Sequence, residues 1–145
     1  MTRWLLLGVA VLAAGCGGDE TAGWKKTEGG VKYEDVAEGG GRGVKAGDRV
    51  SVFYKGWLSN GGKVFDTNMG KAPFTFTLGQ KQVIQGWEEG VVGMKPRGRR
   101  KLYIPAALAY GDKGSGEEIP PGADLMFEVH LISGDADMGP EEDGR

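Results

Sequence analysis

Histidine and cysteine are almost absent from this chain of 145 residues, which contains one of each, His130 and Cys16. One histidine and one cysteine cannot supply a Ser–His or Cys–His nucleophilic pair, a His/Cys metal site or an internal disulfide. His130 falls on the polar face of the last predicted strand, where a solvated side chain is expected. We therefore expect a protein with no metal and no cofactor.

An excess of charge of one sign is also missing, because 18 Lys and Arg oppose 20 Asp and Glu, a net charge of −2. Residues 31–134 carry 14 basic against 12 acidic residues, a net of +2, whereas residues 135–145 carry five acids and one arginine, a net of −4. Neither value indicates a nucleic-acid binder. The length and the 39% hydrophobic content indicate one globular domain.

Long hydrophobic runs are absent outside the N-terminus, "MTRWLLLGVAVLAAGC". Its apolar stretch from Trp4 to Ala14 is shorter than the roughly 20 residues of a membrane-spanning helix, but it suits a signal peptide. The ending "LAAGC" resembles the lipobox of bacterial lipoproteins, in which the cysteine is lipidated, for example by palmitate, after cleavage. The alternatives are a plain secretory signal with an incidental Cys16, or a misplaced start.

Composition divides the chain into four segments. Residues 1–16 are predicted as a lipoprotein signal peptide, with Cys16 as the lipidation site, and residues 17–30 as a flexible tether rich in Gly and charge. The folded domain is predicted at 31–134, and an acidic disordered tail at 135–145. The expected location is the cell envelope, with a lipid anchor on the extracytoplasmic side of a membrane.

Glycine, in contrast, is abundant, with 28 residues gathered between apolar runs as turns in a β-rich protein would be. Asn60-Gly61-Gly62 between two extended runs predicts a hairpin. One short helix is predicted at 83–91. Alternating apolar and polar residues predict strands at 49–58, 63–67, 73–78, 97–105 and 124–132, with a weaker one at 31–37. The fold class is therefore α+β, an antiparallel sheet of five to six strands around one short α-helix.

Two further patterns have ordinary explanations. "GRGVKA" at 41–46 resembles part of a dinucleotide-binding loop, but it precedes a strand and is interpreted as a turn. The basic run Lys95, Arg97, Arg99, Arg100 and Lys101 is interpreted as a solvated strand face, with contact to a membrane surface as the alternative.

Aromatic residues gather near strand ends, the helix and a loop, with one acid, Asp66, among them. They fit an ordinary core, which is where aromatics usually lie. Asp66 beside Phe65 favours a pocket instead, because a buried acid needs a partner or a purpose. The aromatic residues in question are Tyr54, Phe65, Phe74, Phe76, Trp87, Tyr110 and Phe127.

Four blocks in order resemble the FKBP-type peptidyl-prolyl cis-trans isomerases: "YKGWLSNGGKVFDTN", "PFTFTLGQKQVIQGWEEGVVGMKPRGRRKLYIP", "AYG" and "IPPGADLMFEVHLI". The resemblance covers residue 31 to about residue 133. It implies a sheet wrapped around a short helix, an aromatic pocket between them, and non-covalent acceleration of rotation about X–Pro bonds. Together with the predicted signal peptide, it predicts that exported proteins are the substrates. It further implies proline-containing polypeptide substrates, ligands of the tacrolimus or rapamycin type, and a monomer.

The same resemblance assigns roles to individual residues. Tyr54, Asp66, Tyr110 and Phe127 are the implied catalytic residues, and Trp87 is the implied pocket floor. The Ile84 N–H and the Tyr110 hydroxyl are the implied donors to ligand carbonyls. The implied substrate-binding set is Phe65, Phe74, Val83, Ile84, Trp87 and Ile119. The loop "TNMGKA" after Asp66 is one residue shorter than in small family members, and Ser115 and Leu108 also depart from the usual pattern.

Two glycines flank this tryptophan within the predicted helix, although each costs about 1 kcal/mol there relative to alanine. If Trp87 is a pocket floor, Gly86 would leave room for substrate and Gly90 would let the helix approach a strand. A binding module that docks proline-bearing segments without turnover is the alternative function. It would be expected to lose residues at the Tyr54, Asp66, Trp87 or Phe127 positions.

Overall fold

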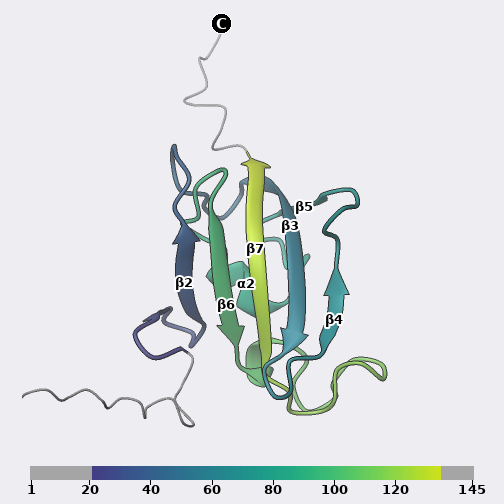
Figure 1. Ribbon diagram of the computed structural model, residues 1–145. Helices are drawn as coiled ribbons and strands as arrows, with labels where there is room; N and C mark the ends of the chain where they lie inside the picture. Colours follow the sequence, from purple (N-terminus) through teal and green to yellow (C-terminus); the bar gives the residue numbers. More distant parts are fainter. Residues whose placement is uncertain (1–20, 135–145) are drawn as a thin grey trace, which may run out of the picture.

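The computed structural model describes residues 21–134, and these form one antiparallel sheet with a short helix on one face (Figure 1). The sheet has seven strands in the order β1-β2-β6-β7-β3-β4, and β5 pairs with β3 beside β4. The predicted α+β class is therefore confirmed. The elements are β1 Lys25–Lys26, β2 Lys32–Ala37, β3 Arg49–Leu58, β4 Val64–Thr67, β5 Phe74–Thr77, α2 Gln85–Gly90, β6 Arg99–Ile104, the 3-10 turn η2 Ala106–Leu108, and β7 Leu125–Gly134.

The two ten-residue strands β3 and β7 pair along almost their whole length, from Val50 to Leu58 of β3, and form the centre of the sheet. Their alternation places Val50 and Val52 of β3 beside Val129 and Leu131 of β7, all at most 1% exposed. Leu102 and other apolar residues of the neighbouring strands extend the same buried layer. The period-two pattern thus separates one apolar face, which α2 covers, from a polar face.

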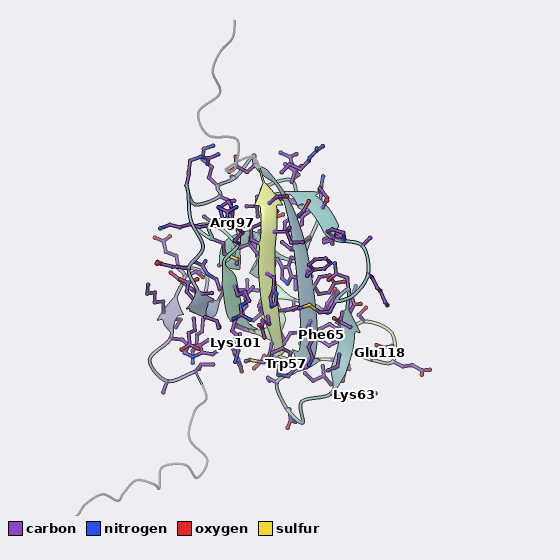
Figure 2. All side chains as sticks on the ribbon, turned by 45° about the horizontal axis from the view of Figure 1, so that its top comes forward. Trp57, Lys63, Phe65, Arg97, Lys101 and Glu118 are labelled. Carbon is purple, nitrogen blue, oxygen red and sulfur yellow. The ribbon has the colours of Figure 1, made fainter. Side chains whose placement is uncertain are left out.

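The opposite face of the sheet carries matched charges. Across β2, β6, β7 and β3, the register places Glu34, Lys101, Glu128 and Lys55 side by side in one row. Opposite charges on neighbouring strands stabilise such a face in water. Figure 2 labels Lys101 in this row and Trp57 in the next row toward the turn.

Helix α2 is shorter than predicted, covering Gln85–Gly90 instead of 83–91. Ile84 is its N-cap with an extended backbone, φ −63° and ψ 155°, and so ends the preceding loop. The Ile84 carbonyl accepts the N–H groups of Trp87 and Glu88 at 3.0 and 3.2 Å. Val83 and Ile84 therefore belong to the loop that enters the helix.

Both glycines of α2 face β6. A Cβ at Gly90 would lie 2.8 Å from Cδ2 of Leu102, and a Cβ at Gly86 would lie 2.3 Å from Cγ2 of Ile104. The prediction that Gly90 permits close packing on a strand agrees with this geometry. The prediction that Gly86 leaves room for substrate is wrong, because Gly86 is buried against the sheet.

Part of the predicted tether is packed onto the domain. β1 pairs with β2, and the Thr27 hydroxyl donates a hydrogen bond of 2.9 Å to Glu89 of α2. Val31, where the folded domain is predicted to begin, is fully buried. Ordered chain therefore starts upstream of residue 31. Cys16 and the predicted acidic tail lie outside the described residues, and among residues 21–134 no helix is long and apolar enough to cross a membrane.

Arg100 does not belong to a solvated basic face, which corrects the prediction for this residue. It is 6% exposed and pairs with Asp35 of β2, with Nε at 2.7 Å from Oδ1. Its Nη1 donates to the carbonyls of Gly90 and Val92 at 2.9 and 3.0 Å. Arg100 points inward because β6 alternates, whereas its neighbour Arg99 is exposed. It supplies the cation that the last turn of α2 lacks.

Candidate functional site

One cleft lies where α2 meets the β3, β4 and β5 edge of the sheet. It has a volume of about 200 Å³, and its wall is formed by residues of β3, β4, β5, β7 and α2, by the loop before α2 and by the loop after η2. Nine of the ten pocket residues implied by the sequence border it, together with Gln82. The lining residues are Tyr54, Phe65, Asp66, Phe74, Gln82, Val83, Ile84, Trp87, Tyr110 and Phe127.

Trp87 forms the base of this cleft and is 5% exposed. Its ring centroid lies 5.2 Å from that of Tyr54 and 5.3 Å from that of Phe127, with interplanar angles of 82° and 86°. Phe74 also meets it edge-on, at 6.3 Å. Edge-to-face contacts of this kind hold the indole in one orientation while three rings stand around it. The result is a flat apolar floor with upright aromatic walls.

The exposure of the aromatic side chains separates a cleft from an ordinary core. Phe74 and Tyr110 are 39% and 38% exposed, although large apolar side chains in a core are covered. Tyr54 and Phe65 are half-buried, and both pack against the buried cluster. The aromatic group therefore leaves apolar surface open to a ligand.

Tyr54 and Asp66 form the polar end of the cleft. The Tyr54 hydroxyl donates a hydrogen bond of 2.8 Å to Oδ2 of Asp66. Burial of the phenol, followed by this hydrogen bond and the nearby carboxylate charge, raises the pKa of Tyr54 to about 12. The hydroxyl therefore stays protonated at neutral pH. Asp66 itself is exposed, so the expectation of a buried acid is wrong, and its partner is Tyr54.

Two hydrogen-bond donors at the rim have no partner within residues 21–134. No hydrogen bond of this part of the chain uses the Ile84 N–H or the Tyr110 hydroxyl as donor. Ile84 lies at the start of α2, and Tyr110 lies in the loop that follows η2. Both residues border the same cleft and leave their donors available to carbonyl groups of a ligand.

Ile119 lies apart from the other implied pocket residues. It is 5% exposed and lines an adjoining cavity, which it shares with Phe65, Asp66 and Tyr110. The backbone of Ile119 pairs with Ser115, so the loop between Tyr110 and Pro121 closes on itself as a small hairpin. Figure 2 shows Glu118 of this loop beside the strand that bears Phe65.

Two residues that shape the cleft were not predicted from the sequence. Gln82 borders the cleft and accepts the Thr77 N–H at 2.9 Å, which ties the loop before α2 to β5. Gly56 of β3 lies beneath two pocket rings, since a Cβ there would come within 2.6 Å of Phe127 and 2.8 Å of Phe65. A glycine inside a strand often marks a place where another group packs closely against the backbone. Gly56 within the predicted strand 49–58 was therefore the sequence signal for this contact.

Metal chemistry has no candidate group in the described part of the chain. Among residues 21–134, no cluster of three or more His, Cys, Asp or Glu side chains has a geometry that could hold a metal ion. The cleft instead combines aromatic walls with hydroxyl, carboxylate and backbone groups. Its surface suits a compact apolar ring flanked by carbonyl groups.

An antiparallel sheet around one short helix, with an aromatic cleft between them, defines the class of the protein as an FKBP-like α+β domain. A model of the family "FKBP-type peptidyl-prolyl cis-trans isomerase" matches residues 40–132. The chain belongs to this family. The predicted fold and the family resemblance are both confirmed by this match and by solved structures.

Relatives of known name share much of the sequence. The FK506-binding protein of Neisseria meningitidis serogroup B is 50% identical over 105 residues, which cover 72% of this chain and 95% of that protein. FK506-binding protein 4 of Rhizopus delemar is 49% identical over 108 residues, 74% of this chain. The chain spans only 28% of the length of the Rhizopus protein, and likewise 28% of its Dictyostelium discoideum counterpart.

Two solved structures share the fold. The crystal structure of FkpA from Escherichia coli has a TM-score of 0.68 and 41% sequence identity, covering 77% of this chain and 51% of that one. The crystal structure of AtFKBP13 has a TM-score of 0.68 and 36% identity, covering 76% of this chain and 97% of that one.

Proposed function

We propose that this protein is a peptidyl-prolyl cis-trans isomerase that accelerates rotation about X–Pro bonds in the aromatic cleft. The observation that carries this proposal is the Trp87 floor between the upright rings of Tyr54 and Phe127. A proline ring is compact, apolar and flat enough to pack on an indole held in this way. Membership of the isomerase family supports the same conclusion.

The energetics of X–Pro rotation require only such a cleft. The barrier of about 18–20 kcal/mol arises because twisting the amide breaks its resonance. The planar amide is more polar than the twisted one, so a water-poor aromatic site disfavours the ground state more than the transition state. Preferential binding of the twisted form satisfies the general condition for catalysis. A thousandfold acceleration needs about 4 kcal/mol of such preference.

The donors at the rim of the cleft orient the substrate. In this proposal, the Ile84 N–H and the Tyr110 hydroxyl each donate to a carbonyl group of the peptide that flanks the proline. The protonated Tyr54 hydroxyl stays bound to Asp66 and keeps the polar end of the cleft in one arrangement. No covalent intermediate forms, and the only bond that changes is the rotating C–N amide bond.

A protease-coupled assay on short X–Pro peptides tests the proposal. Wild type is expected to accelerate isomerisation, and Trp87→Ala with Phe127→Ala is expected to abolish the acceleration. Trp57→Ala is the matched control, since this tryptophan projects from the other face of β3 and does not border the cleft. If wild type were no faster than the double variant but still bound prolyl peptides through Trp87, the protein would be a binding module and not an enzyme.

We also propose that the substrates are exported polypeptides and that the protein is lipid-anchored at Cys16 in the cell envelope. The signal-like stretch "MTRWLLLGVAVLAAGC" supports this assignment. Because β1 packs onto the domain, the free part of the tether would be shorter than residues 17–30. Detergent phase partitioning of wild type against Cys16→Ser tests the anchor. Identical partition of both proteins into the aqueous phase would refute it.

A ligand of the tacrolimus or rapamycin type is proposed to occupy the same cleft. The names of the relatives as FK506-binding proteins support this proposal, as does the apolar cleft of about 200 Å³. Such a ligand should inhibit isomerisation competitively and should bind the monomer. Undiminished turnover at saturating macrolide, or equal binding by the Trp87→Ala variant, would argue against a shared site.

A further inference from the structure

Strand β3 changes partner at the point where it enters the cleft. Its first half pairs with β5, ending at the pair Val52 and Phe74, and its second half pairs with β4, beginning at Lys55 and Thr67. Among residues 21–134, no strand pairs with Phe53 and Tyr54 on this side. Since unpaired backbone groups inside a sheet are costly, something else must satisfy them.

The side chain of Asn68 fills this gap as a strand would. Its Oδ1 accepts the Tyr54 N–H at 2.7 Å, and its Nδ2 donates to the Val52 carbonyl at 3.1 Å. The two ends of one carboxamide thus pair with two residues of β3, as a peptide group in a neighbouring strand does. Asn68 Nδ2 also donates to the Ala72 carbonyl at 3.1 Å, which joins the loop before β5 to the same point.

Backbone groups around Asn68 complete the junction. The Tyr54 carbonyl accepts the Asn68 N–H at 3.2 Å and the Thr67 hydroxyl at 2.8 Å. The Asn68 carbonyl accepts the Lys71 N–H at 2.9 Å, which closes the short loop between β4 and β5. Asn68 is only 9% exposed and does not border the cleft. Its polar atoms therefore serve the scaffold and are not available to a substrate.

We propose that Asn68 is the positioning residue of the cleft, holding Tyr54 in place by substituting for the missing strand partner of β3; this inference rests on the proposed isomerase function. Asn68 directly follows β4, which bears Asp66, and its carboxamide bonds to β3, which bears Tyr54, and to Ala72 in the loop that leads to Phe74 of β5. One side chain thus sets the distances between three walls of the cleft.

Tyr54 is the residue whose placement matters most. Its ring packs edge-on against Trp87 at 5.2 Å, and its hydroxyl reaches Asp66 at 2.8 Å. Without the bond to Asn68, the part-buried Tyr54 N–H would be left unpaired, and β3 would shift to find water or another partner. A misplacement of about 1 Å can cost about a hundredfold in rate, even though the altered residue touches no substrate.

The variants Asn68→Ala and Asn68→Asp test this role. Asn68→Ala is expected to lower kcat/KM roughly ten- to a hundredfold at a temperature where circular dichroism shows it folded. In Asn68→Asp, an ionised carboxylate still accepts the Tyr54 N–H but faces the Val52 and Ala72 carbonyls without a donor. Protonation of this carboxylate restores one donor to these carbonyls. The kcat/KM of Asn68→Asp should therefore rise as pH falls, while that of wild type stays level.

Asp48→Asn is the matched control. Asp48 is also a buried polar residue, 4% exposed, and it accepts the Lys45 N–H at 3.0 Å in the turn that precedes β3. It lies at the end of β3 that is remote from the cleft, and it is not one of the residues that line the cleft. Asp48→Asn should lower stability while leaving kcat/KM within about twofold of wild type, since the cleft geometry is untouched.

Two results would overturn the inference. One is a kcat/KM of Asn68→Asp that does not depend on pH and matches wild type. The other is unchanged hydrogen exchange of the Tyr54 amide in either Asn68 variant, because loss of its acceptor should accelerate that exchange. The exchange measurement needs no enzymatic activity. An inactive wild type whose Tyr54 amide still depends on Asn68 would therefore refute the proposed function and keep the positioning role.

Discussion

Gly86 of α2 lies directly against Ile104 of β6, so closely that a Cβ at Gly86 would come within 2.3 Å of Cγ2 of Ile104. Ile104 is fully buried, and its Cγ2 is attached to a branched carbon that cannot swing away. The helix that carries Trp87 therefore rests on the sheet at a distance that only glycine permits. This contact sets the depth of the cleft floor.

Gly86→Ala should destabilise the domain, although alanine favours helices by about 1 kcal/mol over glycine. Overpacking of a filled core typically costs about 1–3 kcal/mol, and the Ile104 contact leaves no relief. Urea unfolding monitored by circular dichroism measures the change. Gly90→Ala should cost less, because the terminal methyl groups of Leu102 can move. Equal or greater stability of Gly86→Ala would contradict this packing.

Gly56→Ala should impair activity more than it impairs stability. Its new Cβ would meet Phe127 at 2.6 Å and Phe65 at 2.8 Å, so these two rings, which line the cleft, would have to shift. We expect kcat/KM to fall about tenfold or more, equivalent to at least about 1.4 kcal/mol of transition-state stabilisation. Gly40→Ala is a suitable control, since its nearest neighbour would be 3.8 Å away. A Gly56→Ala enzyme as fast as the control would disprove the clash.

The raised pKa of Tyr54 predicts how stability changes in alkaline solution. The phenol has a pKa of about 12 in the folded protein against 10.0 in its ordinary state, so the folded protein holds this proton more tightly. Its contribution is complete below about pH 10 and is lost as pH rises through about pH 12. Unfolding free energies measured over this range should fall more steeply for wild type than for Tyr54→Phe.

Asp66→Asn separates the causes of this shift. Because it removes the carboxylate charge, it should lower the pKa of Tyr54 but leave the contribution of burial. The titration can be followed by the ring-carbon resonance of Tyr54 in NMR spectra. A Tyr54 pKa that is the same in wild type and Asp66→Asn would mean that the hydrogen bond is not formed in solution.

Arg100→Met should be strongly destabilising, whereas Arg99→Met should have little effect. Removing Arg100 leaves Asp35 and the carbonyls of Gly90 and Val92 without their donor, and breaking a buried ion pair costs about 3–5 kcal/mol. Asp35 retains some access to water, which favours the lower end of that range. Thermal unfolding of the two variants gives the comparison. Similar unfolding temperatures of the two variants would show that the hydrogen bonds of Arg100 contribute little to stability.

The sequence predicted the strands well because their alternation is local. The runs at 49–58 and 124–132 became β3 and β7 with almost the predicted bounds, since period-two patterns depend only on near neighbours. Helix α2 was predicted too long at both ends. Val83, Ile84 and Val91 continue the apolar run, but the extended backbone of Ile84 begins the helix only at Gln85.

Residues that depend on distant partners were harder to interpret. Arg100 is chemically like Arg99 and adjacent to it, yet one is buried against Asp35 of β2 and the other is exposed. The loop that contains Asn68 was distinguished from the family pattern by its length, and this gave no sign of the role of Asn68. Its partners Val52 and Tyr54 are 16 and 14 residues away in the sequence. Nothing in the local sequence identifies such partners.

The sequence by itself determined the alternation of the strands, the hairpin at Asn60-Gly61-Gly62 and the group of aromatic residues whose spacing matches the isomerase family. These features depend on residues that are near one another in the sequence and on the chemistry of their side chains. Only the tertiary structure decided that Gly86 faces Ile104, that Asp66 is exposed beside Tyr54, and that Asn68 bridges β3. Each of these depends on which distant segments come into contact, and contact is settled when the sheet closes around α2.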